Sequence, residues 1–244
     1  MKIELDCHTH SFASGHAYNT MTEMIQAAAD KGLKLLALTE HAPAMPGSCG
    51  NYYFYNYKIL PRIRNGIEVM YGVELNIMDY KGRLDLPVQY IQSTDLRIAS
   101  LHTPCIKPGT VEENTSAVFG AIHSPYVDIL GHMDDGRFPL DYEKVVSEAK
   151  KFGKIIELNN SSLSPLNSRT FTRENDILLL EKCREYEVPV IIGSDSHADF
   201  QIGVFDDAIN LIEEIDFPRE LIVNDSVEKF KKYLAIGREL GKNL

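Results

Sequence analysis

The sequence predicts an α/β fold in which parallel strands and helices alternate around a barrel. Two observations predict it: seven short apolar runs with strand character recur along the chain, and amphipathic segments with apolar residues at helical spacing lie between them. Alternation of this kind is typical of βαβ units, whose strands are parallel. Glycines punctuate the junctions, as at Gly32, Gly153 and Gly193, which supports the division into elements.

The predicted elements follow in order from the N-terminus. The strands lie within residues 2–8, 33–41, 68–74, 96–102, 127–132, 154–160 and 188–197. The helices are expected at residues 21–31, 111–121, 141–152, 172–186 and 206–214, followed by a closing helix at residues 226–240 that packs on the barrel. Residues 42–57 form the longest irregular piece, rich in Pro, Gly, Ser and aromatic residues, and we interpret it as a candidate substrate lid.

Size and composition restrict the class of protein. The chain has 244 residues, 44% hydrophobic and 25% charged, which fits one globular domain over residues 1–244. We see no apolar run of membrane-spanning length and no signal peptide, and the four cysteines are scattered, so we expect a cytoplasmic protein with reduced thiols and no membrane partner. A net charge of -10 disfavours stable nucleic-acid binding but allows an anionic substrate, because bound divalent ions reverse the local potential.

Each predicted strand ends in polar side chains that an apolar core would exclude. In a parallel barrel all strand C-termini open on one face, so residues far apart in sequence converge there. Burying so many polar groups without a binding partner is costly, which argues against a purely structural role for the set. In order, the strand-end residues are His8 with His10, His41, Glu74, His102, His132, Asn159 with Asn160, and Asp195 with His197.

Two of these pairs have the spacing of chelating pairs. Side chains alternate faces in an extended segment, so His8 and His10 point the same way, as do Asp195 and His197. Imidazole and carboxylate donors suit Zn, Mn and Fe, and seven histidines, one Glu and one Asp exceed what one ion can bind, so two or three divalent ions are expected. Glu74 is the natural bridge, and bridged ions would generate a hydroxide nucleophile at neutral pH.

The segment after the sixth strand supplies donors that are not metals. Arg169 could hold two phosphate oxygens in bidentate geometry, and a solvated rim charge is the alternative for both Arg169 and Arg173. Further candidates for contact with the substrate are Asn159, Asn160, Ser161 and Tyr18. The general acid is left open between a metal-bound water, Asp195 and one of these rim residues.

Several nearby residues receive a plainer interpretation. His123 lies between a helix and a strand at the opposite end of its unit, so it is left out of the site. Cys7 has the parity opposite to His8, and Cys105 follows a proline in a loop; neither has an evident activating arrangement for a nucleophile. Asp6 shares a face with His8 and could hydrogen-bond a ligand imidazole.

With these residues in place, the chain resembles the PHP (polymerase and histidinol phosphatase) superfamily, and within it the small stand-alone bacterial phosphatases that hold three zinc ions. The motifs DCHTHSFASGHAYNT, LTEHAP, GVELNI, LHTP, GH at 131–132, ELNNSS and GSDSH match in order over residues 6–197. The resemblance implies a distorted, TIM-like seven-stranded (β/α) barrel. It departs from close relatives after His132, where Met133-Asp134-Asp135 replaces a usual proline, and we expect this to affect substrate choice.

The resemblance also implies how the ligands are divided among the ions. One ion would be held by His8, His10, Glu74 and Asp195; a second would share Glu74 and take His102 and His132; and a third would take His16, His41 and His197. It thereby gives a role to His16, which spacing alone does not place. The expected cofactors are two or three divalent ions, Zn before Mn or Fe.

The function expected first is a metal-dependent phosphatase that hydrolyses a small phosphomonoester through a metal-activated hydroxide, with Glu74, Asp195 and Arg169 as catalytic residues. The partners are then a small phosphorylated substrate and, as a further option, a second copy of the chain. A phosphodiesterase acting on nucleotides or short oligonucleotides is the alternative. An amidohydrolase-type metal hydrolase ranks lower, because the Glu lies on the third strand and the last strand carries Asp195 and His197 together. A non-enzymatic metal-holding domain is disfavoured by the completeness of the ligand set.

Overall fold

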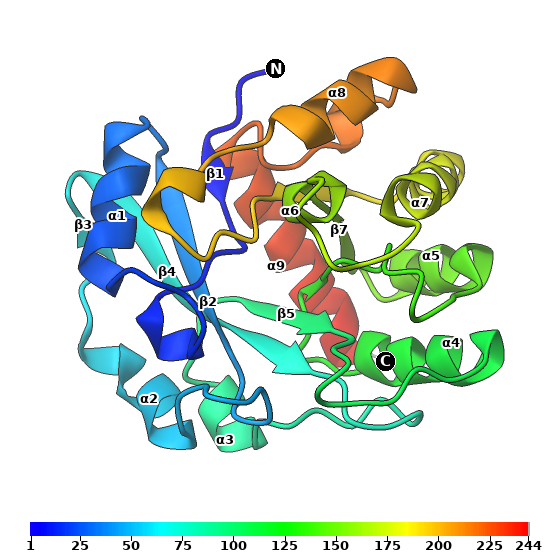
Figure 1. Cartoon of the computed structure of the whole chain (residues 1–244), viewed down its shortest axis with the longest axis horizontal. Helices are drawn as coiled ribbons and strands as arrows, with labels where there is room; N and C mark the ends of the chain where they lie inside the picture. Colours follow the sequence, from blue (N-terminus) through cyan, green and yellow to red (C-terminus); the bar gives the residue numbers. More distant parts are fainter. Residues whose placement is uncertain (244) are drawn as a thin grey trace.

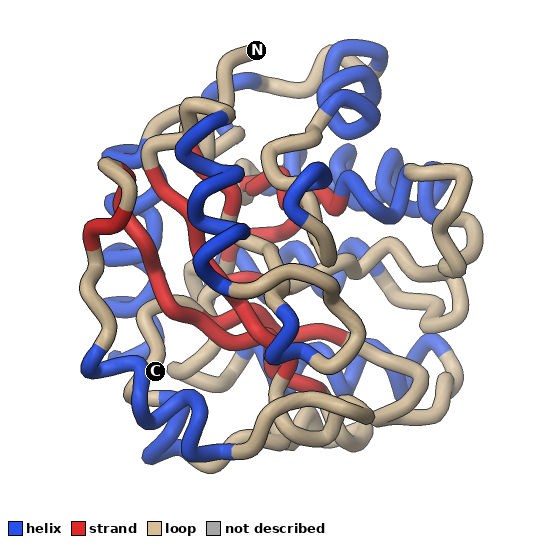
Figure 2. Tube along the Cα trace, turned by 60° about the vertical axis from the view of Figure 1, so that its left-hand side comes forward, coloured by secondary structure: helices blue, strands red, loops and turns tan. Residues whose placement is uncertain are grey.

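The computed structural model describes residues 1–243, and its centre is a sheet of parallel strands rolled into a nearly closed barrel (Figures 1 and 2). The sheet order is β1-β2-β4-β5-β6-β7-β8, and the short β3 pairs antiparallel to β4. The strands are β1 Leu5–Asp6, β2 Leu35–His41, β3 Ile63–Arg64, β4 Ile67–Asn76, β5 Arg97–Ser100, β6 Ile129–Leu130, β7 Ile155–Asn159 and β8 Val190–Gly193. All seven predicted strands and the α/β barrel are confirmed.

The first and last strands meet at a seam. β1 and β8 form no ladder with each other, but the parallel bridge between Thr9 and Ser196 joins the segments that follow them. The N–H of His10 donates to the carbonyl of Ser196 at 2.8 Å. The barrel is therefore closed just beyond the strands, at the end where the polar residues gather.

Helices surround the barrel, with α1 to α3 on one side and α4, α5 and α7 on the other in Figure 1. Their bounds are α1 Met21–Asp30, α2 Asn51–Tyr55, α3 Val88–Ile91, α4 Val111–Ile122, α5 Tyr142–Lys151, α6 Asn160–Leu163, α7 Thr172–Tyr186, α8 Asp206–Glu214 and α9 Val227–Asn243. The six predicted helices are confirmed to within one to three residues at each end. The sequence did not predict α2, α3, α6 or β3, each of which spans at most five residues. No helix among the described residues has the length and apolar character needed to cross a bilayer.

Side-chain caps explain where the longer helices begin. Thr20 and Glu23 form a capping box at α1, and Thr110 and Glu113 form another at α4. In each, the threonine hydroxyl accepts from the backbone N–H three residues on, while the glutamate accepts from the backbone N–H of the threonine. Asp141 caps α5 by accepting from the N–H of Lys144. Such caps typically contribute about 1 kcal/mol each.

Helix α9 closes the end of the barrel opposite to the strand C-termini. Its Phe230 and Leu234 are buried and pack into the apolar cluster of the barrel interior. The other buried members of that cluster come from the strands and their flanks: Leu5, Cys7, Leu35, Ala37, Leu96, Ile98, Ile129, Ile155, Ile191 and Val223. A second, larger cluster lies between the outside of the barrel and the surrounding helices. The predicted closing helix thus forms the floor of the barrel.

The prediction of an irregular lid over residues 42–57 is wrong in its second half. That half forms α2 and the start of a 3₁₀ helix, Asn56–Ile59, and it places Phe54 and Tyr57 in the core at no more than 1% exposure. The first half is pinned. Gly47 packs so closely on Gly15 that a Cβ on Gly15 would lie 2.3 Å from the carbonyl carbon of Gly47, and both glycines have positive φ angles. The second half of the segment is therefore part of the core, and the first half packs on the loop that contains Gly15.

Candidate metal centre

The strand ends surround a cavity of about 610 Å³ at the open end of the barrel. Five imidazoles line it, together with one carboxylate and two guanidinium groups: His16, His41, His102, His132 and His197, with Asp195, Arg137 and Arg169. His8, His10 and Glu74 are each at most 1% exposed and lie beneath this lining, within contact of it. The structure thus brings all nine predicted ligands to one end of the barrel.

Glu74 is at the centre of the cluster. It lies near the end of the inward-facing row of β4, before Asn76, and is the register partner of His41 on β2, so the two side chains emerge together. Five imidazoles surround its fully buried carboxylate. The nearest nitrogen to oxygen distances are 2.7 Å from His41 Nδ1, 2.9 Å from His132 Nε2, 3.2 Å from His102 Nε2, 3.4 Å from His8 Nε2 and 3.5 Å from His10 Nε2.

Asp195 forms a second focus beside Glu74. Its Oδ1 lies 3.4 Å from His10 Nε2, 3.6 Å from His8 Nε2 and 3.7 Å from His197 Nδ1. Its Oδ2 accepts from Arg169 Nη2 at 3.0 Å. One carboxylate oxygen thus faces imidazoles while the other is held by a guanidinium.

His16 comes from the loop after β1 and reaches the cluster from outside. Its Nε2 lies 3.1 Å from Nε2 of His197, and its ring stacks on that of His41 with a centroid separation of 4.9 Å. Two imidazole nitrogens that approach so closely share one proton or one ion. The loop that carries His16 is the one pinned by Gly15 and Gly47.

Several buried donor atoms of the cluster have no hydrogen-bond partner among the described residues. They are His8 Nε2, His10 Nε2, His41 Nδ1, His132 Nδ1 and Glu74 Oε2. The 2.7 Å contact from His41 Nδ1 to Glu74 Oε2 is an ion-pair distance, but it lacks hydrogen-bond geometry. Leaving so many buried polar atoms unpaired is costly, and cations that accept their lone pairs remove the cost. This donor set fits divalent metal ions.

The grouping of ligand atoms differs in part from the predicted partition. Four sets have ligand atoms within 4.8 Å of one another: His8 with His10 and Glu74; His8 with His132 and Asp195; His41 with Glu74 and His102; and His10 with His41 and His197. The first set matches three of the four residues predicted for one ion. His41, however, also belongs with Glu74 and His102, whereas the prediction grouped it with His16 and His197. His16 belongs to none of these four sets, and both the binding of ions by the nine residues and their division among ions stay predictions.

Charges within the cluster set the protonation of its members. Burial opposes ionisation of Glu74, but the imidazoles of His102, His8 and His41 hold the pKa of its carboxyl well below the usual value. Burial likewise opposes ionisation of Asp195, and His8, His10 and Arg169 hold its pKa well below the usual value. Both carboxylates are therefore charged acceptors, the form that binds cations.

The pKa values of His10 and His8 are shifted in opposite directions because their neighbours differ. Burial, followed by the proximity of His41 and His197, lowers the pKa of His10 well below its usual value, so this ring is neutral and has a free lone pair. For His8, burial favours the neutral form, but Glu157, Asp195 and Glu74 together raise its pKa well above the usual value. His8 thus lies where the negative charge of the site is concentrated, which is where a cation is stabilised most.

A layer of polar residues behind the imidazoles orients them. Glu157 Oε1 lies 2.7 Å from His8 Nδ1, and Asn76 Oδ1 lies 2.8 Å from His102 Nδ1. Ser14 Oγ lies 3.0 Å from His10 Nδ1 and donates to the buried Glu40 at 2.6 Å. A hydrogen bond at Nδ1 fixes the ring so that Nε2 faces the ligand position. The sequence contained a signal for one of these residues, because Glu157 has the same parity on β7 as the inward-facing Ile155 and Asn159.

Asp6 does not have the role predicted for it. Its carboxylate accepts from the backbone N–H groups of Ser194 at 3.2 Å and Gly203 at 3.0 Å, and none of its hydrogen bonds within residues 1–243 goes to an imidazole. Glu157 occupies the position behind His8 instead. Gly193 allows this, because a Cβ there would lie 2.1 Å from Glu157 Oε1.

Two of the predicted ligands have strained backbones. His132 has a φ of 32° and Asp195 a φ of 52°, in the left-handed region that residues other than glycine seldom adopt. Such conformations cost about 1–3 kcal/mol each and tend to occur at functional sites. Each lies two residues beyond the end of its strand, β6 or β8, and has its side chain in the donor cluster at the barrel mouth.

The residues predicted to contact substrate are placed unevenly. Arg169 lines the cavity, but its Nη1 donates to Ser162 Oγ at 2.9 Å and its Nη2 to Asp195, so it is already held by the protein. Asn159 is fully buried and donates to Glu157 and Asp195. Asn160 accepts from the N–H of Ala208 on α8, and Tyr18 is 83% exposed outside the cavity lining. The structure therefore brings only Arg169 of these four to the cavity surface.

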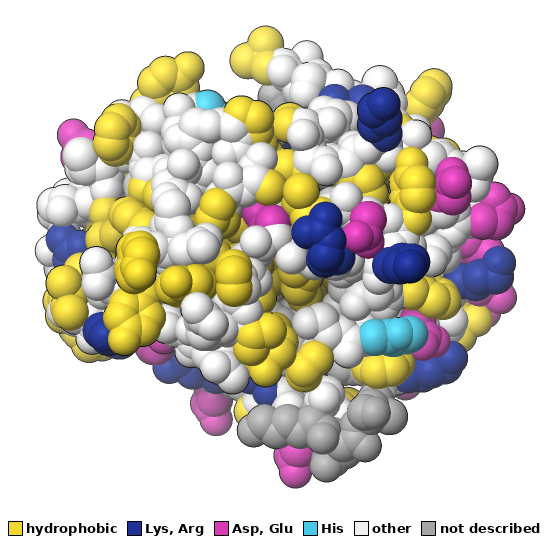
Figure 3. All heavy atoms as spheres, turned by 90° about the horizontal axis from the view of Figure 1, so that it is seen from below, with side chains coloured by type: hydrophobic (Ala, Val, Ile, Leu, Met, Phe, Trp, Pro, Cys, Tyr) yellow, Lys and Arg dark blue, Asp and Glu magenta, His cyan; other side chains and the backbone are white. Residues whose placement is uncertain are grey.

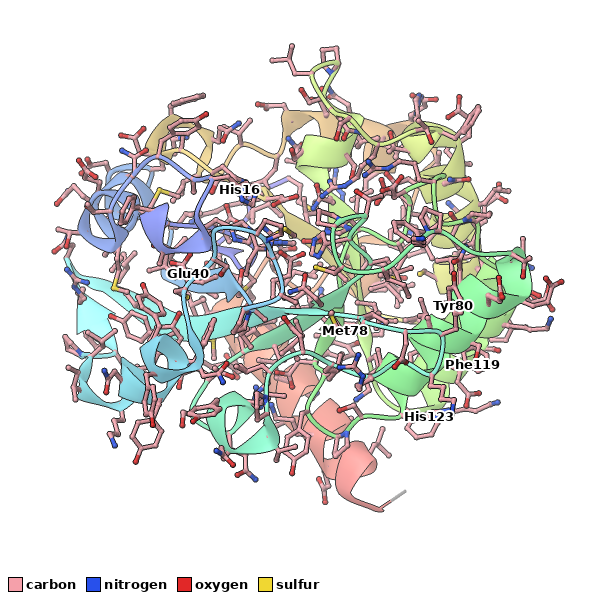
Figure 4. The ribbon with its side chains drawn as sticks, turned by 60° about the horizontal axis from the view of Figure 1, so that its bottom comes forward. His16, Glu40, Met78, Tyr80, Phe119 and His123 are labelled. Carbon is pink, nitrogen blue, oxygen red and sulfur yellow. The ribbon has the colours of Figure 1, made fainter. Side chains whose placement is uncertain are left out.

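Of the other residues considered in the sequence analysis, some line the cavity and some lie away from it. Ser161 lines it, whereas Arg173 pairs with Glu214 on the surface. His123 pairs with Glu148 at 2.7 Å and lies at the edge of the molecule, away from His16, in Figure 4. Cys7 packs in the apolar cluster of the barrel interior, and burial raises the pKa of its thiol well above the usual value, so it is no nucleophile.

The two aspartates after His132 have different surroundings. Asp134 is fully buried, like Asp176 on α7, and neither carboxyl has a hydrogen-bond partner among the described residues. Burial raises the pKa of Asp134, and it raises that of Asp176 well above the usual value with a further contribution from Asp134. Asp135 instead forms an ion pair with Arg137 at the cavity wall.

Comparison with known proteins identifies the family. A sequence model of the PHP domain matches residues 6–163. The chain is 46% identical over 234 residues to a probable phosphatase of Clostridium novyi, covering 96% of this chain and 95% of that protein. It is 44% identical over 239 residues to a probable phosphatase of Acetivibrio thermocellus, covering 98% of both proteins.

A solved structure agrees on the fold. The histidinol phosphate phosphatase of Lactococcus lactis, determined with Zn, L-histidinol and phosphate, superposes with a TM-score of 0.59 over 89% of this chain and 95% of that chain, at 16% identity. At that identity the likeness concerns the fold alone. The family match over most of the chain and the close relatives along its length show that the chain belongs to the PHP domain family.

Proposed function

We propose that the protein is a metal-dependent phosphatase that hydrolyses a small phosphomonoester. The observation that carries the proposal is the cluster of imidazole and carboxylate donors around Glu74, several of them buried without partners, at the base of an open cavity. The names of the relatives in Clostridium novyi and Acetivibrio thermocellus support the reaction class. The structural neighbour bound to Zn and phosphate supports the combination of metal and phosphate on this fold.

The proposed cofactors are two or three divalent ions, with Zn expected first and Mn or Fe next. The residues that would hold them are His8, His10, His16, His41, Glu74, His102, His132, Asp195 and His197. Bound there, divalent ions would act as Lewis acids toward phosphoryl oxygens and make water nucleophilic at neutral pH. We also propose that residues 1–244 form a single PHP domain, since α9 at the end of the chain packs into the barrel that β1 begins.

Arg169 and Asp195 complete the proposed site. Arg169 has a side chain only 14% exposed, and its ion pair with Asp195 raises its pKa further against the opposing effect of burial. It is a fixed positive charge at the cavity surface, where it would stabilise the negative charge that develops on a phosphoryl group. Its hydrogen bond to Oδ2 also holds Asp195 so that Oδ1 faces the imidazoles.

A monoester is favoured over a long nucleic acid. On the face in Figure 3, lysine and arginine side chains are interspersed with aspartate and glutamate and form no continuous basic band. The cavity of about 610 Å³ is of the size that takes a small molecule. A diester of a short nucleotide is the second substrate class to test.

Release of phosphate from p-nitrophenyl phosphate tests the proposal. Protein loaded with Zn²⁺ or Mn²⁺ should release phosphate, and a chelator should abolish the release. His102→Ala should remove most activity, whereas the matched variant His123→Ala, outside the cavity, should keep it. Absence of phosphate release from any phosphomonoester with either metal contradicts the proposal, and faster release of p-nitrophenol from bis-p-nitrophenyl phosphate than from p-nitrophenyl phosphate would favour the diesterase.

A further inference from the structure

The cavity has a second arginine, placed apart from the donor cluster. Arg137 lies in the loop after β6 and lines the cavity. Its recorded side-chain partner among the described residues is Asp135, with Nε 2.9 Å from both carboxylate oxygens and Nη2 2.6 Å from Oδ2. No ligand atom of the metal cluster is among its recorded contacts. The sequence did not single out this residue.

The ion pair presents its positive end to the cavity. Asp135 is 3% exposed and does not line the cavity, whereas the side chain of Arg137 is 33% exposed and does. The carboxylate grips the edge of the guanidinium formed by Nε and Nη2. Asp135 does not contact Nη1, so the end formed by Nη1 and Nη2 keeps N–H donors that the ion pair does not use, and two parallel N–H donors match the two oxygens of a carboxylate.

The loop that carries Arg137 is held in place. Asp135 also accepts from the backbone N–H of Arg137 at 3.0 Å, so the loop and the ion pair fix each other. The N–H of Gly136 donates to the carbonyl of Thr170 at 2.7 Å, which ties the loop to the segment that carries Arg169. A Cβ on Gly136 would lie 2.6 Å from that carbonyl oxygen, so only glycine allows this contact. The two arginines are thus positioned by one connected framework.

The other side chains of the outer wall carry no charge. They are the apolar Met45, Pro46, Leu101, Pro104 and Leu166 and the polar Thr103, Ser161, Asn167 and Ser168. Among the described residues that line the cavity, Arg137 is the one charged group that belongs neither to the donor cluster nor to the Arg169 and Asp195 pair. A leaving group that extends outward from a phosphoryl group at the donor cluster therefore meets uncharged side chains and one cation.

We propose that Arg137 binds a carboxylate on the leaving group, so that the substrate is a phosphomonoester of a hydroxy acid. The inference rests on the proposed phosphatase function and narrows it to a substrate class. A carboxylate brings one negative charge and two oxygens to one open guanidinium end, whereas a leaving group with an amine would face a like charge there.

A set of matched esters tests the proposal. The esters are O-phosphorylated hydroxy acids with two, three and four carbons, each compared with its carboxamide, which has the same shape without the charge. We expect kcat/KM, measured by phosphate release with Zn²⁺ or Mn²⁺, to favour the acid over the amide by about tenfold or more at one chain length at least. The O-phosphorylated amino alcohol of the same length should be the poorest substrate.

Variants of Arg137 test whether this residue causes the preference for the acid over the amide. In Arg137→Met the ratio of acid to amide should fall to about one, and in Arg137→Lys a part of it should remain, which guards against a loss that comes from misfolding. Arg83→Met is the matched control, because Arg83 also pairs with an aspartate, Asp79, but lies outside the cavity. It should keep the full ratio.

The outcomes distinguish a failure of this inference from a failure of the proposed phosphatase function. Equal rates for acid and amide at every length, with phosphate still released, overturn the carboxylate site and leave the phosphatase intact. A preference that survives in Arg137→Met overturns the role of Arg137. No release from any ester, p-nitrophenyl phosphate included, overturns both.

Discussion

The two ends of the barrel differ in whether their buried polar and charged groups have partners within the protein. At the end closed by α9, charged groups are partnered within the protein. Asp128 accepts from Arg238 at 2.8 Å and from the N–H of Arg97 at 3.0 Å. The buried Lys154 donates to the carbonyls of Ser124 at 2.9 Å and Val127 at 2.7 Å. These two buried charged groups are thus satisfied within the protein.

At the open end, several buried polar atoms have no hydrogen-bond partner among the described residues. Here the imidazoles of His8, His10, His41 and His132 have ring nitrogens without a hydrogen-bond partner among the described residues, and so does one oxygen of Glu74. The change occurs along single strands: the inward-facing row of β7 passes from Ile155 to Glu157 to Asn159. Polar atoms with hydrogen-bond partners stabilise the folded protein, whereas buried polar atoms without partners are available to bind a ligand. Four experiments test this contrast.

Glu74→Gln should have the largest effect, on the open end alone. Removal of the central negative charge should lower the metal content by more than one ion per chain. It should also reduce kcat/KM by about 10³-fold or more, since metal ions supply several kcal/mol of charge stabilisation. Elemental analysis and phosphate release measure these changes. Glu148→Gln removes a surface carboxylate that pairs with His123 and should change neither quantity; a full metal complement in Glu74→Gln would contradict the central role of Glu74.

Phe230→Ala should have the next largest effect, on the closed end alone. Phe230 is fully buried in the floor of the barrel, so its truncation should lower the free energy of unfolding by about 3–4 kcal/mol. Metal content in the folded protein should not change. Urea unfolding measures the loss, and Phe200→Ala, at a site 72% exposed, should stay within about 0.5 kcal/mol of the parent. If metal content fell with stability, the two ends would not be independent.

Glu157→Gln should have a moderate effect on the open end. The variant keeps the shape of the side chain but loses the charge that holds His8 Nδ1 at 2.7 Å. Metal affinity should fall about 10- to 100-fold, as when other residues that orient metal-binding histidines are replaced. Competition with a chromophoric chelator measures this affinity. An unchanged affinity would mean that the histidine is oriented by packing alone.

Acidification of the metal-free protein should have the smallest effect. Burial, followed by His41 and His197, lowers the pKa of His16 from 6.5 to about 4. Between these values the unfolded chain binds the proton and the folded protein does not, so the stability from this group is present above pH 6.5 and is lost as the pH falls toward 4. His16 is partly exposed, so solvent screening limits the change to less than about 1 kcal/mol. Urea unfolding at pH 7 and pH 5 should therefore show a shallower decrease for His16→Asn than for the parent; an identical decrease would contradict this.

The sequence predicted the fold and the members of the cluster because both follow from periodicity. The seven strands have continuous apolar runs, and α7 and α8 match their predicted bounds because their apolar positions recur at helical spacing. The convergence of His8, Glu74 and Asp195 follows from one rule, that parallel strands end on the same face. No knowledge of side-chain contacts was needed for either.

What the sequence did not predict depends on contacts between distant segments. Helix α2 is only five residues long, and its place in the core is determined by the packing of Phe54 and Tyr57. The role given to Asp6 was wrong because the backbone N–H groups of Ser194 and Gly203 reach its carboxylate, and no local pattern shows that. The position of Arg137 in the cavity wall depends on the path of a loop, which periodicity does not describe.

The seam between β1 and β8 makes the cluster the place where the polypeptide closes on itself. His8 and His10 follow the first strand, and Asp195 and His197 follow the last, on either side of the bridge from Thr9 to Ser196. An ion held by both pairs would be a cross-link between the two ends of the chain. A cross-link that closes so long a loop restricts the unfolded chain and favours the folded one. Metal loading would then complete the ring of strands as well as the site, and metal removal should expose the amides of this seam to hydrogen exchange before those of the other strand pairs.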